Sequence, residues 1–235
     1  MHADPRTWRP QAFGSRRAKD LADPIVEPAW DGVRVLAHVS TAGVHLVDAD
    51  GADLASDHPE IAAELLAAIL ADAAVIDGYL TDQALRSGVG VALGMSESPG
   101  VGEHATQFFL GKQAADYVGG RGRVPGRPVA RTVGQAEAVA AAAPVPIALV
   151  TVDILALDGE SLLDVPLLER KRLLESVLPE GGRVRRTPFV REPAGSTIMT
   201  WRAFGFGGLA HKEANSRYRP GTANQEWTLM AMPRR

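Results

Sequence analysis

Ala29-Trp30-Asp31-Gly32-Val33-Arg34 opens the part of the chain from which the fold can be inferred. Directly after it, apolar and polar residues alternate over residues 34–39 and again over 44–48, on either side of a short turn. Such alternation around a turn predicts a β-hairpin. Two apolar runs, residues 75–80 and 147–155, predict buried strands. Residues 207–212 and 227–232 are expected to complete a second sheet.

Helical patterns lie between these strands. Residues 57–70 predict a helix that places Ile, Leu and Leu side chains on one face, and residues 132–143 begin with a capping box. Residues 164–178 predict a third helix, with a proline near its first turn. Residues 84–128 are rich in Gly, Ser and Pro, which indicates a long insertion or a reduced lobe.

Composition is typical of a folded domain in water. The chain has 235 residues, and 46% of them are hydrophobic, which is enough for a sizeable core. No apolar run has membrane-spanning length and no leader is evident, so a cytoplasmic location without a membrane partner is expected. The chain has no cysteine, and its six histidines are scattered without ligand spacing, so no metal site is predicted.

Four short strings in a particular order carry a family resemblance. The opening stretch is followed by Val75-Ile76-Asp77-Gly78-Tyr79, by Val152-Asp153-Ile154-Leu155 with Asp158-Gly159-Glu160, and by Ser216-Arg217-Tyr218-Arg219-Pro220-Gly221. Residues 152–174 match a Phe-Asp-Leu-Leu strand and the Leu-Leu-Glu-Arg helix after it. Together these strings resemble the adenylation domain of ATP-dependent DNA ligases, which are covalent nucleotidyltransferases. The resemblance extends from about Pro24 to Met232.

The resemblance implies an α+β fold. We expect an ATP-grasp-like nucleotidyltransferase fold, in which two packed, mainly antiparallel sheets are flanked by helices. Residues 1–235 would form a single ligase-like domain, with 84–128 as its Gly- and Pro-rich insertion or reduced lobe. DNA ligases of this family continue into an OB-fold domain, and none is expected in this chain, which stops at Arg235.

The reactive positions of the family hold other residues here. Family members attack the α-phosphate of ATP with the lysine of Lys-x-Asp-Gly-x-Arg, forming lysyl-AMP. That lysine corresponds to Ala29, although Glu27-Pro28, Asp31, Gly32 and Arg34 match. The resemblance implies that nucleotide- or metal-contacting side chains are also missing at Ala49, Tyr79, Val152, Gly207, Leu229 and Ala231. We therefore expect no catalytic residue.

Three nucleotide-facing side chains of the family are retained, namely Glu27, Arg34 and Lys212. Residues 20–82 contain 13 acidic residues and one basic residue, Arg34, so Arg34 is expected to pair with a carboxylate. No cofactor is required, and ATP with Mg²⁺ would bind only if the pocket survives. The Asp31-Gly32 and Asp77-Gly78 pairs are interpreted as turns, where glycine tolerates positive φ.

Two arginine-rich segments suggest contact with DNA. Neither has an acidic residue among its arginines, which are Arg121, Arg123, Arg127 and Arg131 in the first segment and Arg183, Arg185 and Arg186 in the second. Guanidinium groups on Gly- and Pro-bearing segments suit sequence-independent contacts to phosphates. The alternative is that both segments are solvated loops of an arginine-rich chain.

Three functions follow from these observations. The preferred one is a pseudo-ligase that cannot form lysyl-AMP and is retained to bind DNA, a nucleotide or a repair partner such as an OB-fold protein. The second is an active adenylyltransferase or DNA ligase whose nucleophile has moved to Lys212 or Lys19, although charge in its transition state would lack support. The third is a structural protein-interaction module. Replacing Ala29 with lysine is not expected to restore ligation.

Overall fold

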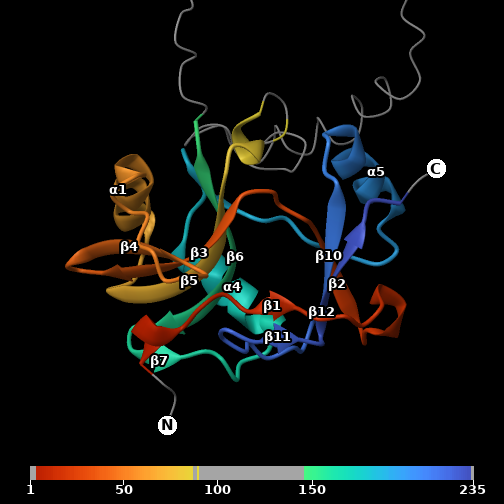
Figure 1. The fold of residues 1–235 in the computed structure, drawn as a ribbon, viewed down its shortest axis with the longest axis horizontal. Coiled ribbons are helices and arrows are strands. Elements are labelled where there is room, and N and C mark those ends of the chain that lie inside the picture. The colour runs from red at the N-terminus through yellow and green to blue at the C-terminus, as the bar shows by residue number, and fades with distance from the viewer. Residues whose placement is uncertain (1–3, 87–88, 90–145, 234–235) are drawn as a thin grey trace, which may run out of the picture.

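The computed structural model describes residues 4–86, 89 and 146–233 (Figure 1). These residues form two main β-sheets with helices packed against them, which confirms the predicted α+β class. The predicted helix at 132–143 and most of segment 84–128 lie outside the described residues. So do four of the candidate DNA-binding residues, Arg121, Arg123, Arg127 and Arg131.

The larger sheet contains the predicted hairpin. Its antiparallel strands run in the order β4 (Gly43–Asp48), β3 (Val33–Ser40), β5 (Ala73–Thr81), β6 (Ala148–Leu157) and β7 (Glu160–Ser161), and β8 (Val184–Arg186) joins β6 in parallel. Helices α1 (Pro59–Ala68) and α4 (Leu167–Val177) begin and end close to the predicted positions. Ile61 and Leu65, one turn apart on α1, are fully buried against this sheet.

The smaller sheet is the second sheet expected from the sequence. Its strands run in the order β12 (Trp227–Ala231), β10 (Gly208–Glu213), β2 (Pro24–Pro28) and β9 (Val190–Arg191), all antiparallel. Figure 1 shows α5 (Gly195–Ala203) beside this sheet. A separate parallel pair joins β1 (Ala12–Phe13) to β11 (Ala223–Asn224). The remaining elements are short 3₁₀ turns, η1 (Pro5–Thr7), η2 (Ala18–Asp20) and η3 (Gln83–Leu85).

Two clusters of buried apolar side chains join the sheets. One cluster includes Trp30, Val150, Val152, Trp201, Phe206 and Leu209. The other includes Trp8, Ile25, Leu36, Leu155, Tyr218 and Trp227. The Trp30 and Phe206 rings meet edge to face with centroids 5.0 Å apart. Both clusters combine side chains from the two sheets, so the expectation of two packed sheets is confirmed.

The two Asp-Gly pairs have different structural roles. Gly32 has φ +129°, as a turn requires, and that expectation is confirmed. Asp77 and Gly78 instead lie inside strand β5, so the turn interpretation was wrong for them. A Cβ at Gly78 would come within 2.8 Å of the Val150 carbonyl oxygen on β6. Gly78 is therefore needed for close strand approach and not for a turn.

Candidate functional site

Ala29, which the sequence resemblance aligns with the family's nucleophilic lysine, lies directly after β2. Its backbone N–H donates to the carbonyl oxygen of Gly208 at 3.0 Å. A Cβ built on Gly208 would lie 3.4 Å from the Cβ of Ala29. Ala29 thus lies opposite Gly208, the residue directly after the replaced position Gly207. Neither position offers an amine or a carboxylate.

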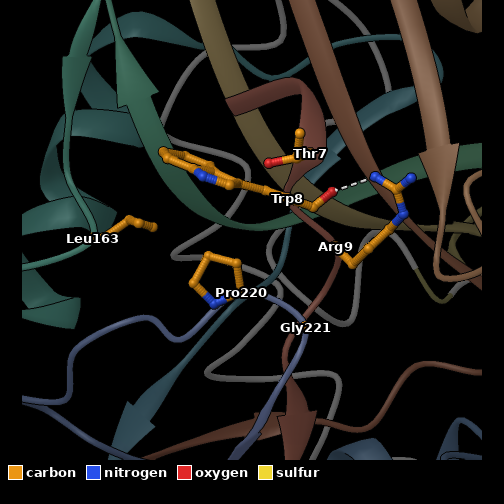
Figure 2. A pocket seen from close by; sticks show the side chains of 6 residues that line it. All are labelled: Thr7, Trp8, Arg9, Leu163, Pro220 and Gly221. Carbon is orange, nitrogen blue, oxygen red and sulfur yellow. Dashed lines mark hydrogen bonds between the residues drawn. The ribbon is translucent and has the colours of Figure 1, made fainter. Parts of the chain in front are cut away.

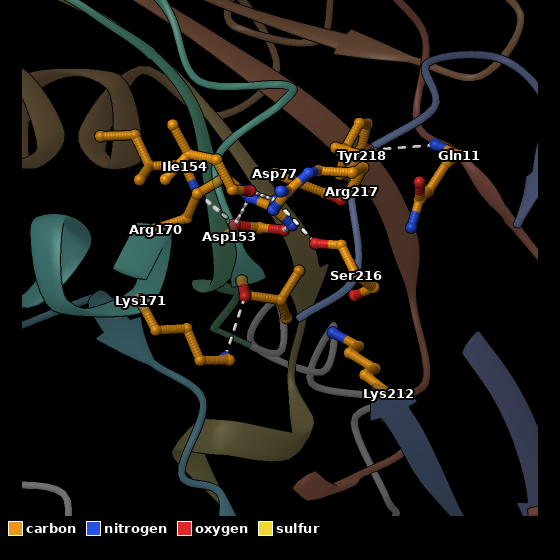
Figure 3. Close-up of polar contacts among 12 residues, drawn as sticks. Gln11, Asp77, Asp153, Ile154, Arg170, Lys171, Lys212, Ser216, Arg217 and Tyr218 are labelled. Carbon is orange, nitrogen blue, oxygen red and sulfur yellow. Dashed lines mark hydrogen bonds and ion pairs between the residues drawn. The ribbon is translucent and has the colours of Figure 1, made fainter. Parts of the chain in front are cut away.

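Two residues before Ala29, Glu27 is buried between two lysines. Figure 3 labels these lysines, Lys171 and Lys212. Its Oε1 lies 2.5 Å from the Nζ of Lys171, and its Oε2 lies 2.7 Å from the Nζ of Lys212. Lys171 also donates to the carbonyl oxygen of Val152 at 3.0 Å. Helix α4 is therefore connected to β2 of the smaller sheet and to β6 of the larger one. Lys212 is only 2% exposed, and its Nζ lies 4.1 Å from the centroid of the Trp227 ring.

Burial and charge act in opposite directions on this cluster. Burial raises the pKa of the Glu27 carboxyl, but Lys171 and Lys212 outweigh it, so the pKa lies below its ordinary value. Burial lowers the pKa of the Lys212 amine, and the Glu27 carboxylate only partly opposes that effect. Glu27 is therefore held as a carboxylate.

Arg34 pairs with a carboxylate, as the charge distribution predicted. Its Nε lies 3.0 Å from Oδ1 of Asp77, and its Nη2 lies 2.6 Å from Oδ2. The Tyr218 hydroxyl donates to the same Oδ2 at 2.7 Å and accepts from the backbone N–H of Gln11 at 3.0 Å. Burial and the Asp77 carboxylate raise the pKa of Tyr218 well above its ordinary value. Arg34 thus links the hairpin to the Ser216–Gly221 motif instead of standing free for a nucleotide.

A second carboxylate–guanidinium pair lies beside the first. Asp153 is the cross-strand neighbour of Asp77, and both Asp153 and Arg170 are completely buried. Arg170 donates from Nε and Nη2 to the two oxygens of Asp153, at 2.9 and 2.7 Å. Its Nη1 donates to the carbonyl oxygen of Ser216 at 3.1 Å. These bonds fix the start of α4 against β6 and the motif loop.

The other replaced positions divide by burial. Val152 is 2% exposed and Tyr79 is half-buried, and both pack with Trp30 in the first apolar cluster. The Tyr79 ring lies 5.7 Å from the guanidinium carbon of Arg34, and burial raises the pKa of its hydroxyl. By contrast, four positions are exposed: Ala49, Gly207, Leu229 and Ala231.

The described arginines of the second segment are engaged within the chain. Arg183 lies within 4 Å of Glu60 and Glu64 on α1, while Arg186 lies equally close to Glu175 and Glu180. Arg185 is 5% exposed, and its Nε donates to the carbonyl oxygen of Gly182 at 2.8 Å. Arg183 and Arg186 therefore help to attach this segment to α1 and α4, whereas Arg185 bonds within its own segment.

A separate pocket of about 300 Å³ lies near the N-terminal end of the described chain (Figure 2). It is lined by Thr7, Trp8, Arg9, Leu163, Pro220 and Gly221. The Arg9 guanidinium donates to the carbonyl oxygen of Trp8 at 2.8 Å. Of the family motifs, only the Ser216–Gly221 string contributes to this lining, through Pro220 and Gly221. Within the described ranges, no group of His, Asp or Glu side chains is arranged to hold a metal ion, and no helix is long and apolar enough to cross a bilayer.

Solved structures establish the class of fold. A mycobacterial DNA ligase D complexed with ATP and MES aligns with a TM-score of 0.60 at 20% identity, covering 97% of this chain and 61% of that one. The ligase domain of M. tuberculosis LigD gives a TM-score of 0.59 at 19% identity, covering 97% and 60%. The two-sheet fold is therefore that of a ligase nucleotidyltransferase domain.

Sequence comparisons point to the same family. Residues 124–230 match the family model described as the ATP dependent DNA ligase domain. A probable DNA ligase of Streptomyces griseus is 29% identical over 88% of this chain and 35% of its own length. A probable DNA ligase of Streptomyces coelicolor is 32% identical over 52% of this chain and 25% of its own length. The chain is similar to the nucleotidyltransferase domain of DNA ligases, and it spans about a third or less of the length of these relatives.

One residue of the site, Lys171, could not be recognised from the motifs. Lys171 lies in the helix after the Phe-Asp-Leu-Leu stretch, where a lysine among Glu and Arg residues suggests a solvated face. In the structure it is 7% exposed and reaches Glu27, which is 144 positions earlier in the chain. A weak signal was available, because Lys171 follows Leu167 by four positions and so falls on the apolar side of the helix.

Proposed function

We propose that this DNA ligase-like domain does not form a covalent lysyl-AMP intermediate and acts by binding. The observation that carries the proposal is the environment of Ala29. Its side chain is a methyl group, the opposite strand presents Gly208, and the nearby Lys212 is buried and paired with Glu27. An attacking amine must be free of such a pair to reach a phosphate. The domain therefore lacks an available nucleophile at the family position.

DNA is the proposed ligand. Support comes from the relatives, which are named as DNA ligases, and from the basic segment 121–131, which lies outside the described residues. Arg183, Arg185 and Arg186 contribute less to this proposal, because Arg183 and Arg186 lie within 4 Å of carboxylates of the chain and Arg185 donates to the Gly182 carbonyl oxygen. We also propose that the domain has a repair or OB-fold protein as a partner and is located in the cytoplasm.

The first experiment looks for covalent nucleotide. The protein is incubated with α-labelled ATP and Mg²⁺ or Mn²⁺, denatured, and examined by electrophoresis and intact-protein mass spectrometry, with a functional DNA ligase in parallel. We expect no protein–AMP band. A band would refute the proposal and favour a relocated lysine. Lys212→Met and Lys19→Met variants would then identify the amine, because only one of them would abolish the band.

The second experiment tests DNA binding. Fluorescence anisotropy with a nicked duplex should give an affinity that falls linearly with salt on logarithmic axes. Replacing the four arginines of the 121–131 segment with glutamine should lower the magnitude of that slope by up to about 4, since each phosphate contact contributes about 0.9. Arg172→Gln, an exposed substitution on α4, is the matched control. Absence of binding at low salt would favour the protein-interaction alternative.

A further inference from the structure

The smaller sheet has one edge that the described residues leave open. Among them, β12 pairs only with β10, so it is the outer strand in the order β12-β10-β2-β9 (Figure 1). Three consecutive residues on it are exposed, namely Leu229 at 53%, Met230 at 38% and Ala231. From Trp227 to Met232 the sequence has no charged residue. An exposed, apolar and uncharged edge strand favours pairing with a further strand.

Other outer strands are protected against such pairing. Beside β4, the chain folds back, so that the Leu54 N–H donates to the Leu46 carbonyl oxygen at 2.9 Å and Oδ1 of Asp53 accepts from the Leu46 N–H at 3.0 Å. Strands β7 and β9 have only two residues each, and each contains a charged one, Glu160 or Arg191. Covering segments, short strands and charges are common protections of sheet edges. Residues 229–231 of β12 have no charge and no covering segment in the described chain.

The hydrogen bonds to β10 show which residues of β12 point their backbone groups outward. In an antiparallel pair, alternate residues exchange hydrogen bonds with the neighbouring strand. The Met232 N–H donates to the Gly207 carbonyl oxygen at 2.9 Å, and the Glu213 N–H donates to the Glu226 carbonyl oxygen at 2.9 Å. The even-numbered residues of this segment therefore bond to β10, and the odd-numbered residues present their backbone groups at the outer edge.

Two of the three outward-facing residues lack a backbone partner. The Trp227 carbonyl oxygen accepts from the N–H of Gly14 at 2.8 Å, which closes that end of the edge. The N–H and carbonyl groups of Leu229 and Ala231 have no hydrogen-bond partner among residues 4–86, 89 and 146–233. The open edge thus offers two donors and two acceptors on residues that lie two positions apart.

We propose that two copies of this chain pair antiparallel through β12, with the two-fold axis at Met230. In this register, Leu229 of one copy exchanges two hydrogen bonds with Ala231 of the other, and the symmetry repeats the exchange. All the free groups are then paired. A two-fold axis at Leu229 would instead place Ala231 opposite Trp227, whose carbonyl oxygen already accepts from Gly14. The free groups therefore select one register.

The side chains are complementary in the same register. Met230 of each copy meets its equivalent on one face, and Leu229 meets Ala231 on the other. Apolar groups thus contact apolar groups, and no like charges come opposite each other. A contact of three residues a side is far smaller than the roughly 1,200 Å² buried in stable interfaces, so the dimer is weak. We expect a Kd of about 10–100 µM.

Disulfide cross-linking tests the register. The chain has no cysteine, so Met230→Cys introduces its only thiol. Residues directly opposite in a non-hydrogen-bonded pair have Cα atoms about 4.5 Å apart, a distance that a disulfide can span. Leu229→Cys is the matched control, because Leu229 is more exposed than Met230 but its two copies would be diagonal neighbours about 7–8 Å apart. Under mild oxidation, non-reducing electrophoresis should show Met230→Cys dimers forming about tenfold faster or more.

Sedimentation equilibrium over a concentration series tests the dimer itself. Ala231→Pro removes an N–H that is not used within the chain, and with it two of the four hydrogen bonds between copies, so the Kd should rise about tenfold or more. Met230→Lys places two ammonium groups opposite each other and should raise the Kd by about as much. Met199→Lys is the matched control, because Met199 is 44% exposed on α5, and its Kd should equal that of wild type.

Three results would each overturn the inference. The wild-type chain could stay monomeric up to about 1 mM, which is the weakest association that such a contact would give. Leu229→Cys could cross-link as fast as Met230→Cys, which would refute the register. A dimer that persists in both Met230→Lys and Ala231→Pro would use another surface. All of these measurements are made without nucleotide or DNA, so their outcome is separate from that of the proposed function.

Discussion

The buried pair of Asp153 and Arg170 allows the sharpest test of what stabilises this fold. Both side chains are 0% exposed, and Arg170 contacts both carboxylate oxygens of Asp153. Asp153→Asn keeps the shape but removes the charge, leaving a buried guanidinium without a counter-ion. Removing one partner of such a pair costs about 3–5 kcal/mol. This is a large part of the roughly 5–15 kcal/mol by which a domain is stable.

The assay is equilibrium unfolding in urea, monitored by the fluorescence of the buried Trp201 and Trp227. With a slope of about 2 kcal/mol per molar urea, a loss of about 4 kcal/mol moves the midpoint down by about 2 M. The matched control is Glu169→Gln, because Glu169 and Arg172 form an ion pair on α4 with side chains 52% and 69% exposed. That variant should lose less than about 1 kcal/mol.

The double variant Asp153→Leu with Arg170→Met separates charge from shape. Replacing a whole buried pair by apolar residues is often neutral or stabilising. Arg170 also bonds the carbonyl oxygens of Val165 and Ser216, and losing these bonds costs about 1 kcal/mol each. We therefore expect the double variant to lie between wild type and Asp153→Asn. The reasoning is refuted if Asp153→Asn loses less than 1 kcal/mol, or if the double variant is the less stable of the two.

Three further predictions follow from the site. Tyr218→Phe removes a hydrogen bond to the buried Asp77 and leaves the Gln11 N–H without its acceptor, so the free energy of unfolding in urea should fall by about 2–3 kcal/mol. A fall of less than about 0.5 kcal/mol would contradict a stabilising role for the Tyr218 hydroxyl. The pKa of Glu27 is lowered in the folded state, so its contribution to stability is present above about pH 4.5 and is lost as the pH falls through the folded pKa. In unfolding experiments from pH 3 to 6, Glu27→Gln should therefore reduce the loss of stability at low pH. An unchanged loss would argue against the ion cluster. Ala29→Lys should give no AMP adduct by mass spectrometry, because the family's metal- and phosphate-binding side chains would still be missing at Gly207, Leu229 and Ala231. An adduct would mean that the pocket is more intact than the sequence implies.

Local patterns were sufficient for much of the fold. The alternation around residues 40–43 predicted the hairpin, because polar and apolar side chains alternate along its strands. The apolar runs predicted β5 and β6, because these strands are buried on both faces. Helix α5 was missed, since Gly195–Ala203 carries Gly, Ser and Thr and no capping bond at its start. Asp77-Gly78 was misread as a turn because the close approach of β6 to Gly78 is a tertiary contact. Such contacts are not encoded in the local sequence.

One contact of the candidate site, the pairing of Arg34, could be predicted from charge alone. Arg34 is the one basic residue in an acidic stretch, and its pairing with a carboxylate followed from that count. The bridge from Lys171 to Glu27 did not follow, because it depends on how α4 lies between the two sheets. Likewise, nothing in the spacing of Arg183 and Arg186 indicated that glutamates of α1 and α4 would lie beside them.

Burial explains which motif residues this chain keeps and which it replaces. The retained charged residues each form an ion pair between or within the sheets, with side chains 13% exposed or less: Glu27, Arg34, Asp77, Asp153 and Lys212. Loss of Arg34, Asp77 or Asp153 would leave a buried partner charge uncompensated, and loss of Glu27 would leave Lys171 and Lys212 without a carboxylate, which destabilises the fold whether or not a nucleotide binds. Ala49, Gly207, Leu229 and Ala231 are exposed, so the family's charged side chains can be lost there at little expense to folding. Retention of Glu27 and Arg34 is therefore accounted for by the demands of the fold and is not evidence for ATP chemistry.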